Sequence, residues 1–226
     1  MSNRDLRHEP QRPARKRRSD GEQSRSAILD EAARLATIEG IEGLSISRLA
    51  DAVGMSKSGL FAHFGSKAEL QLATIDAASE LFAAQVTDPA AGAPTGIERL
   101  HRLVEGYLLY LTLDTFPGGC FFASVLAEVD MRPGAVRDRL LAFLGDWVGQ
   151  LESAVRDAQA EGTVDPAEDP EQLTFEVQAA LLLANTRYVV THAPEPIERA
   201  RRAIEHRLAA APAVGSPSGA RARRSA

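Results

Sequence analysis

The sequence predicts an all-α protein of about nine helices. Apolar residues recur at the three- and four-residue spacing of one helix face along most of the chain, and no stretch alternates as a half-buried strand does. Ser-x-x-Glu capping boxes, glycines and prolines divide these segments into helical lengths, and no internal repeat is present. Hydrophobic residues make up 44% and aromatic residues 5% of the 226 residues, a composition typical of an Ala/Leu-rich helical protein that can bury a real core.

The chain begins with a basic segment. Residues 1–18 hold seven Lys/Arg, two acids and two prolines but few apolar residues, so we expect a disordered arm. Its basic run at residues 13–18 either contacts a minor groove or phosphates, or is only a solvated tail. A capping box from Ser19 to Glu22 then predicts a first helix that ends near Gly40. The buried face of that helix is expected at Ile28, Ala32, Leu35 and Ala36.

Two short helices follow, separated by a glycine. Ser45 is a suitable N-cap for the first, whose buried face has the spacing of Ile46, Leu49, Ala50 and Val53. Gly54 fits the left-handed residue that ends a helix, and Ser56 can cap the next one, with Leu60 and Phe64 as its buried side. Such a pair predicts a helix-turn-helix unit, whose second helix enters the DNA major groove. The alternative is an ordinary helical bundle in which Gly and Ser only make turns.

The outer side of the second short helix carries small and hydrogen-bonding groups. Short side chains let the backbone approach base edges, so we expect Lys57 and Ser58 to reach bases. Phosphate contacts are expected from Ser45, Ser47, His63 and Lys67. The full predicted DNA-binding set is Ser45, Ser47, Arg48, Ser56, Lys57, Ser58, Gly59, Phe61, Ala62, His63 and Lys67.

Charge is distributed unevenly along the chain. The formal net charge is −5, but residues 1–67 hold 12 Lys/Arg against 9 Asp/Glu, a net +3. Residues 68–210 hold 11 against 22, a net −11, which should keep that part away from phosphates. The predicted divisions are a disordered basic arm (1–18), a helix-turn-helix domain (19–67), a regulatory and dimerisation domain (68–210, with a connecting helix at 68–87) and a disordered tail (211–226).

A family pattern covers residues 28–70. It consists of Gly40, Ser45, Leu49-Ala50, Gly54-Met55-Ser56-Lys57, Leu60-Phe61-Ala62-His63-Phe64, Lys67 and Leu70. These residues resemble the DNA-binding domain of TetR/AcrR-type transcriptional regulators. One position departs from the family: Phe61 stands where a tyrosine hydroxyl usually contacts a phosphate. Phe61 keeps the aromatic ring but cannot donate this hydrogen bond, and its loss should cost about 1 kcal/mol of DNA-binding free energy per half-site.

The rest of the chain is expected to form six further helices, the first of which joins the two domains. It ends where residues 87–94 accumulate helix breakers. The expected helices are 67–86, 95–116, 120–129, 133–162, 169–192 and 196–210.

The resemblance implies a small-molecule pocket between the middle helices. Such pockets are mostly apolar, so aromatic residues at helical spacing are the candidates, although the same pattern is typical of plain core. The candidates are Tyr107, Tyr110, Phe121, Phe122, Val125, Trp147 and Tyr188. The single cysteine, Cys120, is either a thiol sensor or a small buried hydrophobic residue.

Residues 173–188 are apolar nearly all round, which predicts a helix that cannot face water. The resemblance implies that the last two helices dimerise as a four-helix bundle; the alternative is one helix central to a monomeric core. The expected interface residues are Leu173, Val177, Ala180, Ala184, Ile204 and Leu208.

The motifs argue against metal, cofactor and enzyme chemistry. The five histidines form no H-x-x-x-H pair, one cysteine cannot build a thiolate zinc site, and the Gly118-Gly119 pair is too short for a phosphate-binding loop. No apolar run approaches the roughly 20 residues that cross a bilayer, so no membrane partner is expected. A secretory signal is not recognisable, and the lone cysteine fits a reducing cytoplasm.

We therefore expect a cytoplasmic, homodimeric, ligand-responsive repressor. It would bind a palindromic operator in double-stranded DNA and release it when a small-molecule effector of unknown identity binds. An activator or an effector-independent regulator of the same fold is the nearer alternative. A helical binding protein or enzyme that keeps the motif only as scaffold is the distant one.

Overall fold

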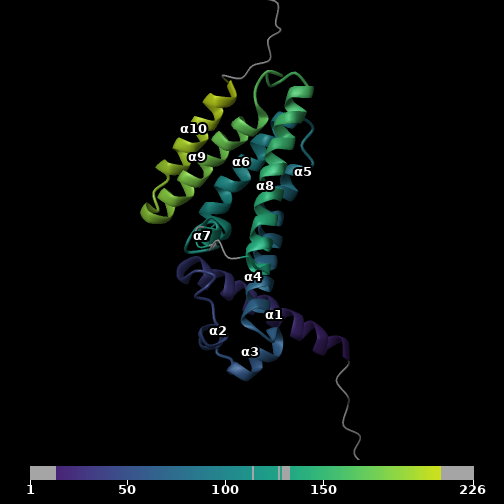
Figure 1. Ribbon diagram of the computed structural model, residues 1–226, viewed down its shortest axis with the longest axis vertical. Coiled ribbons are helices and arrows are strands. Elements are labelled where there is room, and N and C mark those ends of the chain that lie inside the picture. Colours follow the sequence, from purple (N-terminus) through teal and green to yellow (C-terminus); the bar gives the residue numbers. More distant parts are fainter. Residues whose placement is uncertain (1–13, 114, 127, 129–132, 210–226) are drawn as a thin grey trace, which may run out of the picture.

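A computed structural model describes residues 14–113, 115–126, 128 and 133–209, and every regular element among them is helical (Figure 1). This confirms the predicted all-α class. The elements are α1 (Ala14–Glu39), α2 (Ile46–Val53), α3 (Lys57–Phe64), α4 (Lys67–Phe82), the π-helical segment η1 (Ala83–Thr87), α5 (Asp88–Ala91), α6 (Gly96–Thr112), α7 (Phe121–Leu126), α8 (Ala135–Ala160), α9 (Pro170–Thr191) and α10 (Glu195–Ala209).

Side-chain caps set the starts of the short helices in the small N-terminal domain. The Ser45 hydroxyl accepts the N–H three residues later at 3.2 Å, and the Ser56 and Ser66 hydroxyls do the same at 3.1 Å. Gly54 ends α2 with a φ of 67°. This is a left-handed conformation that favours glycine. The turn chemistry expected at Ser45, Gly54 and Ser56 is therefore present.

A compact apolar cluster joins α1, α2, α3 and the start of α4. Because each short helix buries only one or two large side chains, the domain needs α1 to complete this core. The cluster consists of Ile28, Ala32, Leu35, Leu44, Leu49, Ala50, Leu60, Phe64 and Leu70.

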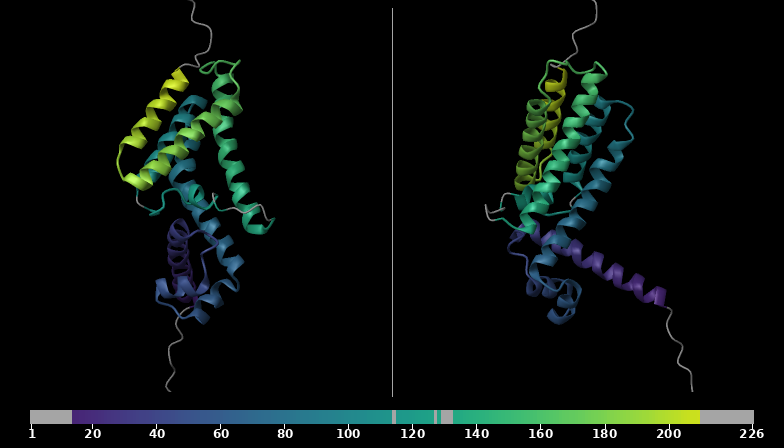
Figure 2. Two further views of the ribbon diagram at one scale, coloured as in Figure 1. Left: turned by 60° about the vertical axis from the view of Figure 1, so that its left-hand side comes forward. Right: turned by 45° about the vertical axis from the view of Figure 1, so that its right-hand side comes forward.

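The start of α1 differs from the prediction. The helix begins at Ala14, so the predicted start at Ser19 is wrong, and residues 14–18 of the expected disordered arm are helical. Ala, Arg and Lys are strong helix formers, so the basic run extends the helix toward the N-terminus. The first turns of α1 project beyond the rest of the small domain (Figure 2). The rest of the arm (1–13) and the predicted tail (211–226) lie outside the described residues.

The connection after α4 also differs. Residues 87–94 were expected to lose helical structure, but the chain passes through η1 into α5. Pro89 lies in the first turn of α5, where a missing N–H costs nothing. Helical structure therefore ends at Ala91, within the predicted segment but later than its start at residue 87.

The larger domain packs α6, α8, α9 and α10 as long helices, with α10 alongside α9 at one side (Figures 1 and 2). At the other side, Gly96 at the start of α6 lies so close to α8 that a Cβ would stand 2.3 Å from the Ala158 nitrogen. The Glu161 carboxylate accepts the Gly96 N–H at 2.8 Å. This bond satisfies one free donor of that helix start.

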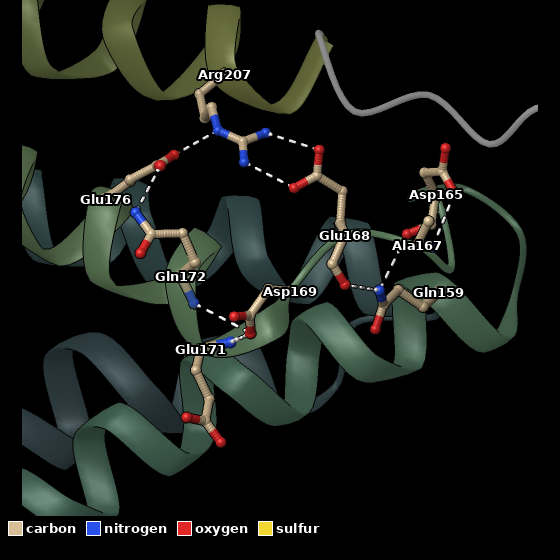
Figure 3. A network of polar contacts seen from close by, with 9 residues as sticks. All are labelled: Gln159, Asp165, Ala167, Glu168, Asp169, Glu171, Gln172, Glu176 and Arg207. Carbon is tan, nitrogen blue, oxygen red and sulfur yellow. Dashed lines mark hydrogen bonds and ion pairs between the residues drawn. The ribbon is translucent and has the colours of Figure 1, made fainter.

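A polar network holds the end of α10 against the α8–α9 turn (Figure 3). Arg207 donates to Glu168 at 2.7 Å and also bonds Glu176, and the hydrogen bond with Glu168 is the first cause that raises the pKa of Arg207. Asp169 caps α9 by accepting the Glu171 N–H at 3.0 Å. These contacts fix α9 and α10 as one unit.

Among the helices in the described ranges, none combines the length and apolar character that crossing a membrane requires.

Candidate DNA interface and internal cavity

The predicted DNA-contact residues are centred on the outward side of α3 and extend from Ser45, before α2, to Lys67 at the start of α4. Leu60 and Phe64 are buried beneath it, which turns the opposite side of α3 to solvent. Ser45, Gly59 and His63 are half-buried. The exposed members of the set are Ser47, Arg48, Ser56, Lys57, Ser58, Phe61, Ala62 and Lys67.

The three cations of this surface differ in how they are held. Arg48 donates to Glu39 at 2.7 Å, and this hydrogen bond lowers the pKa of Glu39 and raises that of Arg48. Lys67 donates to the Glu42 carbonyl oxygen at 2.6 Å. No hydrogen bond or ion pair within the described ranges holds Lys57, so its ammonium is the cation of this surface most available to a partner.

Sequence reasoning missed Arg25 on α1. Its guanidinium donates to the His63 carbonyl oxygen at 3.1 Å and lies 4.6 Å from the centre of the Phe64 ring. The contact fixes the C-terminal end of α3 from outside the motif. It joins residues 38 positions apart in sequence, and no local pattern signals such a pairing.

The larger domain contains a half-open cavity of about 640 Å³ between α4, α6, α7, α8 and α9. Three of the predicted pocket residues, Tyr107, Phe122 and Trp147, line it. The described lining residues are Phe82, Tyr107, Cys120, Phe122, Ala123, Leu126, Phe143, Leu144, Trp147, Phe175, Gln178, Ala179, Leu181, Leu182 and Thr186.

The other four predicted pocket residues lie elsewhere. Tyr110, Phe121 and Val125 are buried in the surrounding core without lining this cavity. Tyr188 lines a separate groove beside α6 and α10. Sequence reasoning missed the contribution of α9, because a helix that is apolar all round does not reveal which side faces a cavity.

Burial controls the titratable groups of the cavity wall and the core beside it. It raises the pKa of the Cys120 thiol and raises the pKa of the Tyr107 and Tyr110 hydroxyls well above their ordinary value. Cys120 is therefore a protonated thiol at neutral pH, which makes it a poor nucleophile.

The loop between α6 and α7 contacts both the small domain and α9. The Gly118 N–H donates to the Thr37 hydroxyl of α1 at 3.3 Å, and the Cys120 N–H donates to the buried Asn185 amide oxygen of α9 at 2.8 Å. Gly119 lies between them with a φ of 81°, and a Cβ there would stand 2.3 Å from Asn185 Oδ1. Cys120, which lines the cavity, is thus two positions from Gly118, which contacts α1 of the small domain.

The predicted dimer-interface residues need correction. Five of the six are only 0–8% exposed in a single chain, because they pack α9 and α10 against each other and the core, and Ala180 is partly buried there too. They have little surface left for a second copy. The side of α9 that stays exposed carries another set, called here the α9 stripe: Phe175, Ala179, Leu182, Leu183, Thr186 and Val190.

Two capped short helices on a three-helix core, joined through α4 to a helical domain with an internal cavity, define a helix-turn-helix regulator with a separate helical domain. The chain belongs to the TetR family. The family described as "Bacterial regulatory proteins, tetR family" matches residues 28–74, and "Tetracyclin repressor-like, C-terminal domain" matches residues 96–204.

Solved structures of this family are similar over most of the chain. A TetR transcriptional regulator from Chloroflexus aurantiacus is 25% identical, with a TM-score of 0.74 over 84% of this chain and 95% of that one. AibR, solved in complex with isovaleryl coenzyme A and operator DNA, is 26% identical, with a TM-score of 0.65 over 80% and 97%. PfmR from Thermus thermophilus is 26% identical, with a TM-score of 0.62 over 80% and 97%. A search of curated proteins found no match.

Proposed function

We propose that the protein is a homodimeric transcriptional repressor, rather than an enzyme, that binds a palindromic operator in the cytoplasm and releases it when a small molecule occupies the cavity. The outward surface of α3 carries this proposal. Its buried side is anchored by Leu60 and Phe64, while Lys57 and Ser58 stand exposed at the helix start. A recognition helix uses the same arrangement to reach base edges.

In this proposal Lys57 and Ser58 contact bases, and residues around them contact phosphates. Lys67 and Arg48 are held by Glu42 and Glu39, so DNA would have to share or replace these partners. Because both pairs are largely exposed, each contributes little to stability and exchange costs little.

The proposed dimer forms through the α9 stripe. A two-fold interface brings the same patch of both copies together, so a patch without charges meets its copy without repulsion. Phe175, Leu182 and Val190 are 50–79% exposed, an unusual state for large apolar side chains along one helix. Two α3 helices would then lie about one DNA turn apart or slightly more.

Ligand response needs a physical connection between the cavity and the DNA-binding domain. Phe82 at the end of α4 lines the cavity, and the start of α4 packs against α3. The Thr37–Gly118 and Cys120–Asn185 hydrogen bonds give a second route. By linkage, an effector that weakens DNA binding is itself bound more weakly on DNA, typically by about 1–3 kcal/mol. AibR, solved in complex with isovaleryl coenzyme A and operator DNA, supports the use of this fold to bind both a small molecule and DNA.

Substitution of two cations tests the proposal. The Lys57→Ala, Lys67→Ala variant should have a lower operator affinity, and its dependence of log affinity on log salt should become shallower by about one unit for each phosphate that is no longer neutralised. The matched control is Arg156→Ala on α8. Unchanged affinity and salt dependence in the double variant would mean that DNA contacts a different surface.

A further inference from the structure

The described lining of the cavity consists of apolar, largely aromatic side chains and a few uncharged hydrogen-bonding ones, and it contains no charged side chain. Six of its lining residues are aromatic: Phe82, Tyr107, Phe122, Phe143, Trp147 and Phe175. Hydrogen-bonding groups come from Tyr107, Cys120, Gln178 and Thr186, all of them uncharged at neutral pH. No Asp, Glu, Lys, Arg or His is present among the described residues that line it.

The absence of charge restricts the ligand. A charged group that enters such a site loses its hydration without gaining a counter-ion, which is strongly unfavourable. Aromatic walls, in contrast, favour ring stacking and edge contacts. The rings of Tyr107 and Trp147 are already parallel within 19°, with centroids 6.0 Å apart. The cavity volume of about 640 Å³ is in the range of sites for drug-sized molecules.

We propose that the effector is an uncharged, largely apolar molecule with an aromatic portion and one or two hydrogen-bonding groups. This inference rests on the proposed function, since it names the ligand class of the same cavity. By the same argument, we expect polyanions such as coenzyme A thioesters to bind more weakly than an uncharged molecule, because the described lining offers their phosphates no cation.

One side of the cavity is completed by a second copy of the chain. Phe175, Ala179, Leu182 and Thr186 line the cavity and also belong to the exposed α9 stripe, so the cavity opens along that stripe. The α9 helix of a partner packed there would cover the opening with apolar side chains and exclude water. Ligand affinity then depends on dimerisation. Leu183 and Val190 belong to the stripe but do not line the cavity, so substituting them disturbs the dimer without changing the cavity wall.

A pair of fluorescent probes tests the ligand class. N-phenyl-1-naphthylamine and 8-anilinonaphthalene-1-sulfonate share one aromatic skeleton and differ in the sulfonate charge. Trp147, the only tryptophan in the chain, lines the cavity, so energy transfer from it reports occupancy there. The neutral probe should quench Trp147 with one site per chain and bind at least about tenfold more tightly than the anionic one. Equal or tighter binding of the anion, or neutral-probe binding that leaves Trp147 unquenched, overturns the assignment.

A reversal experiment controls for non-specific adsorption. Gln178 is half-buried on α9, so Gln178→Lys places a cation in the wall without demanding its full burial. The anionic probe should then bind about tenfold more tightly relative to the neutral one than in the parent protein. The isosteric Gln178→Met variant should keep the original preference. If the lysine variant leaves the ratio unchanged, the probes occupy another site.

Breaking the dimer tests the closure. The Leu183→Glu, Val190→Glu variant should be monomeric by sedimentation and should bind the neutral probe about tenfold more weakly, whereas Leu141→Glu on α8 should change neither. A monomer that binds the probe as the parent does would overturn closure by a second copy and leave the ligand class standing. If both probe experiments succeed but the protein retains no DNA, the proposed function fails while the ligand assignment stands.

Discussion

The exposed sides of α3 and α9 differ in charge and in the amount of apolar surface that they present. Both helices bury one side in the core of their own domain. The exposed side of α3 is short and, apart from Phe61 and Ala62, polar; it carries Lys57, a cation that no described residue pairs, whereas α9 exposes several large apolar residues such as Phe175 and Val190. A polar cationic surface gains from meeting phosphates, and an apolar one gains from leaving water. The difference indicates that one helix meets nucleic acid and the other meets protein or an apolar ligand.

The largest difference in unfolding free energy should be between two leucine substitutions, one on the buried side of α3 and one on the exposed side of α9. Leu60→Ala removes a fully buried side chain of α3 and should cost about 2–5 kcal/mol of unfolding free energy. Leu183 on α9 is 58% exposed. Leu183→Ala should therefore cost less than about 0.5 kcal/mol within one chain. Urea unfolding at two protein concentrations measures both.

Protein concentration is the control for this pair. The Leu60→Ala loss should be independent of concentration, while any loss in Leu183→Ala should depend on it, because that residue would act through the dimer. Equal losses at every concentration would mean that both leucines belong to the interior of one chain.

Alkaline pH should destabilise the domain of α9 and spare that of α3. Burial raises the pKa values of Cys120, Tyr107 and Tyr110 in the folded chain. Their contribution to stability is fully present below the pKa values of the unfolded chain, which are about 9.0 for the thiol and 10.0 for the phenols. Above those values the unfolded chain loses protons that the folded chain keeps, so stability falls as pH rises. The urea midpoint followed from about pH 7 to 11 should decrease, and Cys120→Ala should remove the step that begins near pH 9. A midpoint unchanged by alkaline pH would contradict the burial of these groups.

The network that holds α10 against the α8–α9 turn should have a smaller effect. Arg207→Ala leaves Glu168 and Glu176 without their cation and should cost about 1 kcal/mol, since these side chains are only partly buried. Arg156→Ala, the matched control, removes a more exposed arginine that pairs with a single carboxylate, Glu152. This control should cost about 0.5 kcal/mol or less. Thermal unfolding distinguishes the two; equal losses would show that the network adds nothing beyond a surface ion pair.

The smallest change concerns the surface of α3 alone. Phe61 is 55% exposed, so Phe61→Tyr adds a hydroxyl in solvent and should leave stability unchanged. If this position faces a phosphate, operator affinity should rise by about 1 kcal/mol per half-site, the size of one hydrogen bond. Titration of labelled operator measures the gain, and an unchanged affinity would place residue 61 away from the DNA.

The two helices also differ in how well the sequence predicted them. Ser45, Ser56 and Ser66 act on backbone groups a few residues away, so the motif and its outward surface could be inferred from local spacing. Local spacing gave a wrong helix start at Ser19, because strong helix formers on its N-terminal side extend α1 past a good capping sequence.

The orientation of α9 could not be inferred in this way. Its apolar residues cover every side, and only packing against α10 and the core decides that Leu173 is buried while Phe175 is exposed. The cavity depends on the same choice, because Phe82, Phe143 and Phe175 come from three helices far apart in sequence. The predicted cavity residues differ from the observed ones because long-range packing, which leaves no periodic signal in the sequence, decides which side chains line the cavity.

Selection of DNA fragments by the protein is the sharpest test of whether a dimer presents two α3 surfaces to one duplex. We expect the retained fragments to share a palindrome whose half-sites are centred about one helical turn or slightly more apart, since two α3 surfaces meet one duplex. Lys57→Ala should weaken the retention of these fragments. Retained fragments without two-fold symmetry, or retention that does not depend on Lys57, would contradict it.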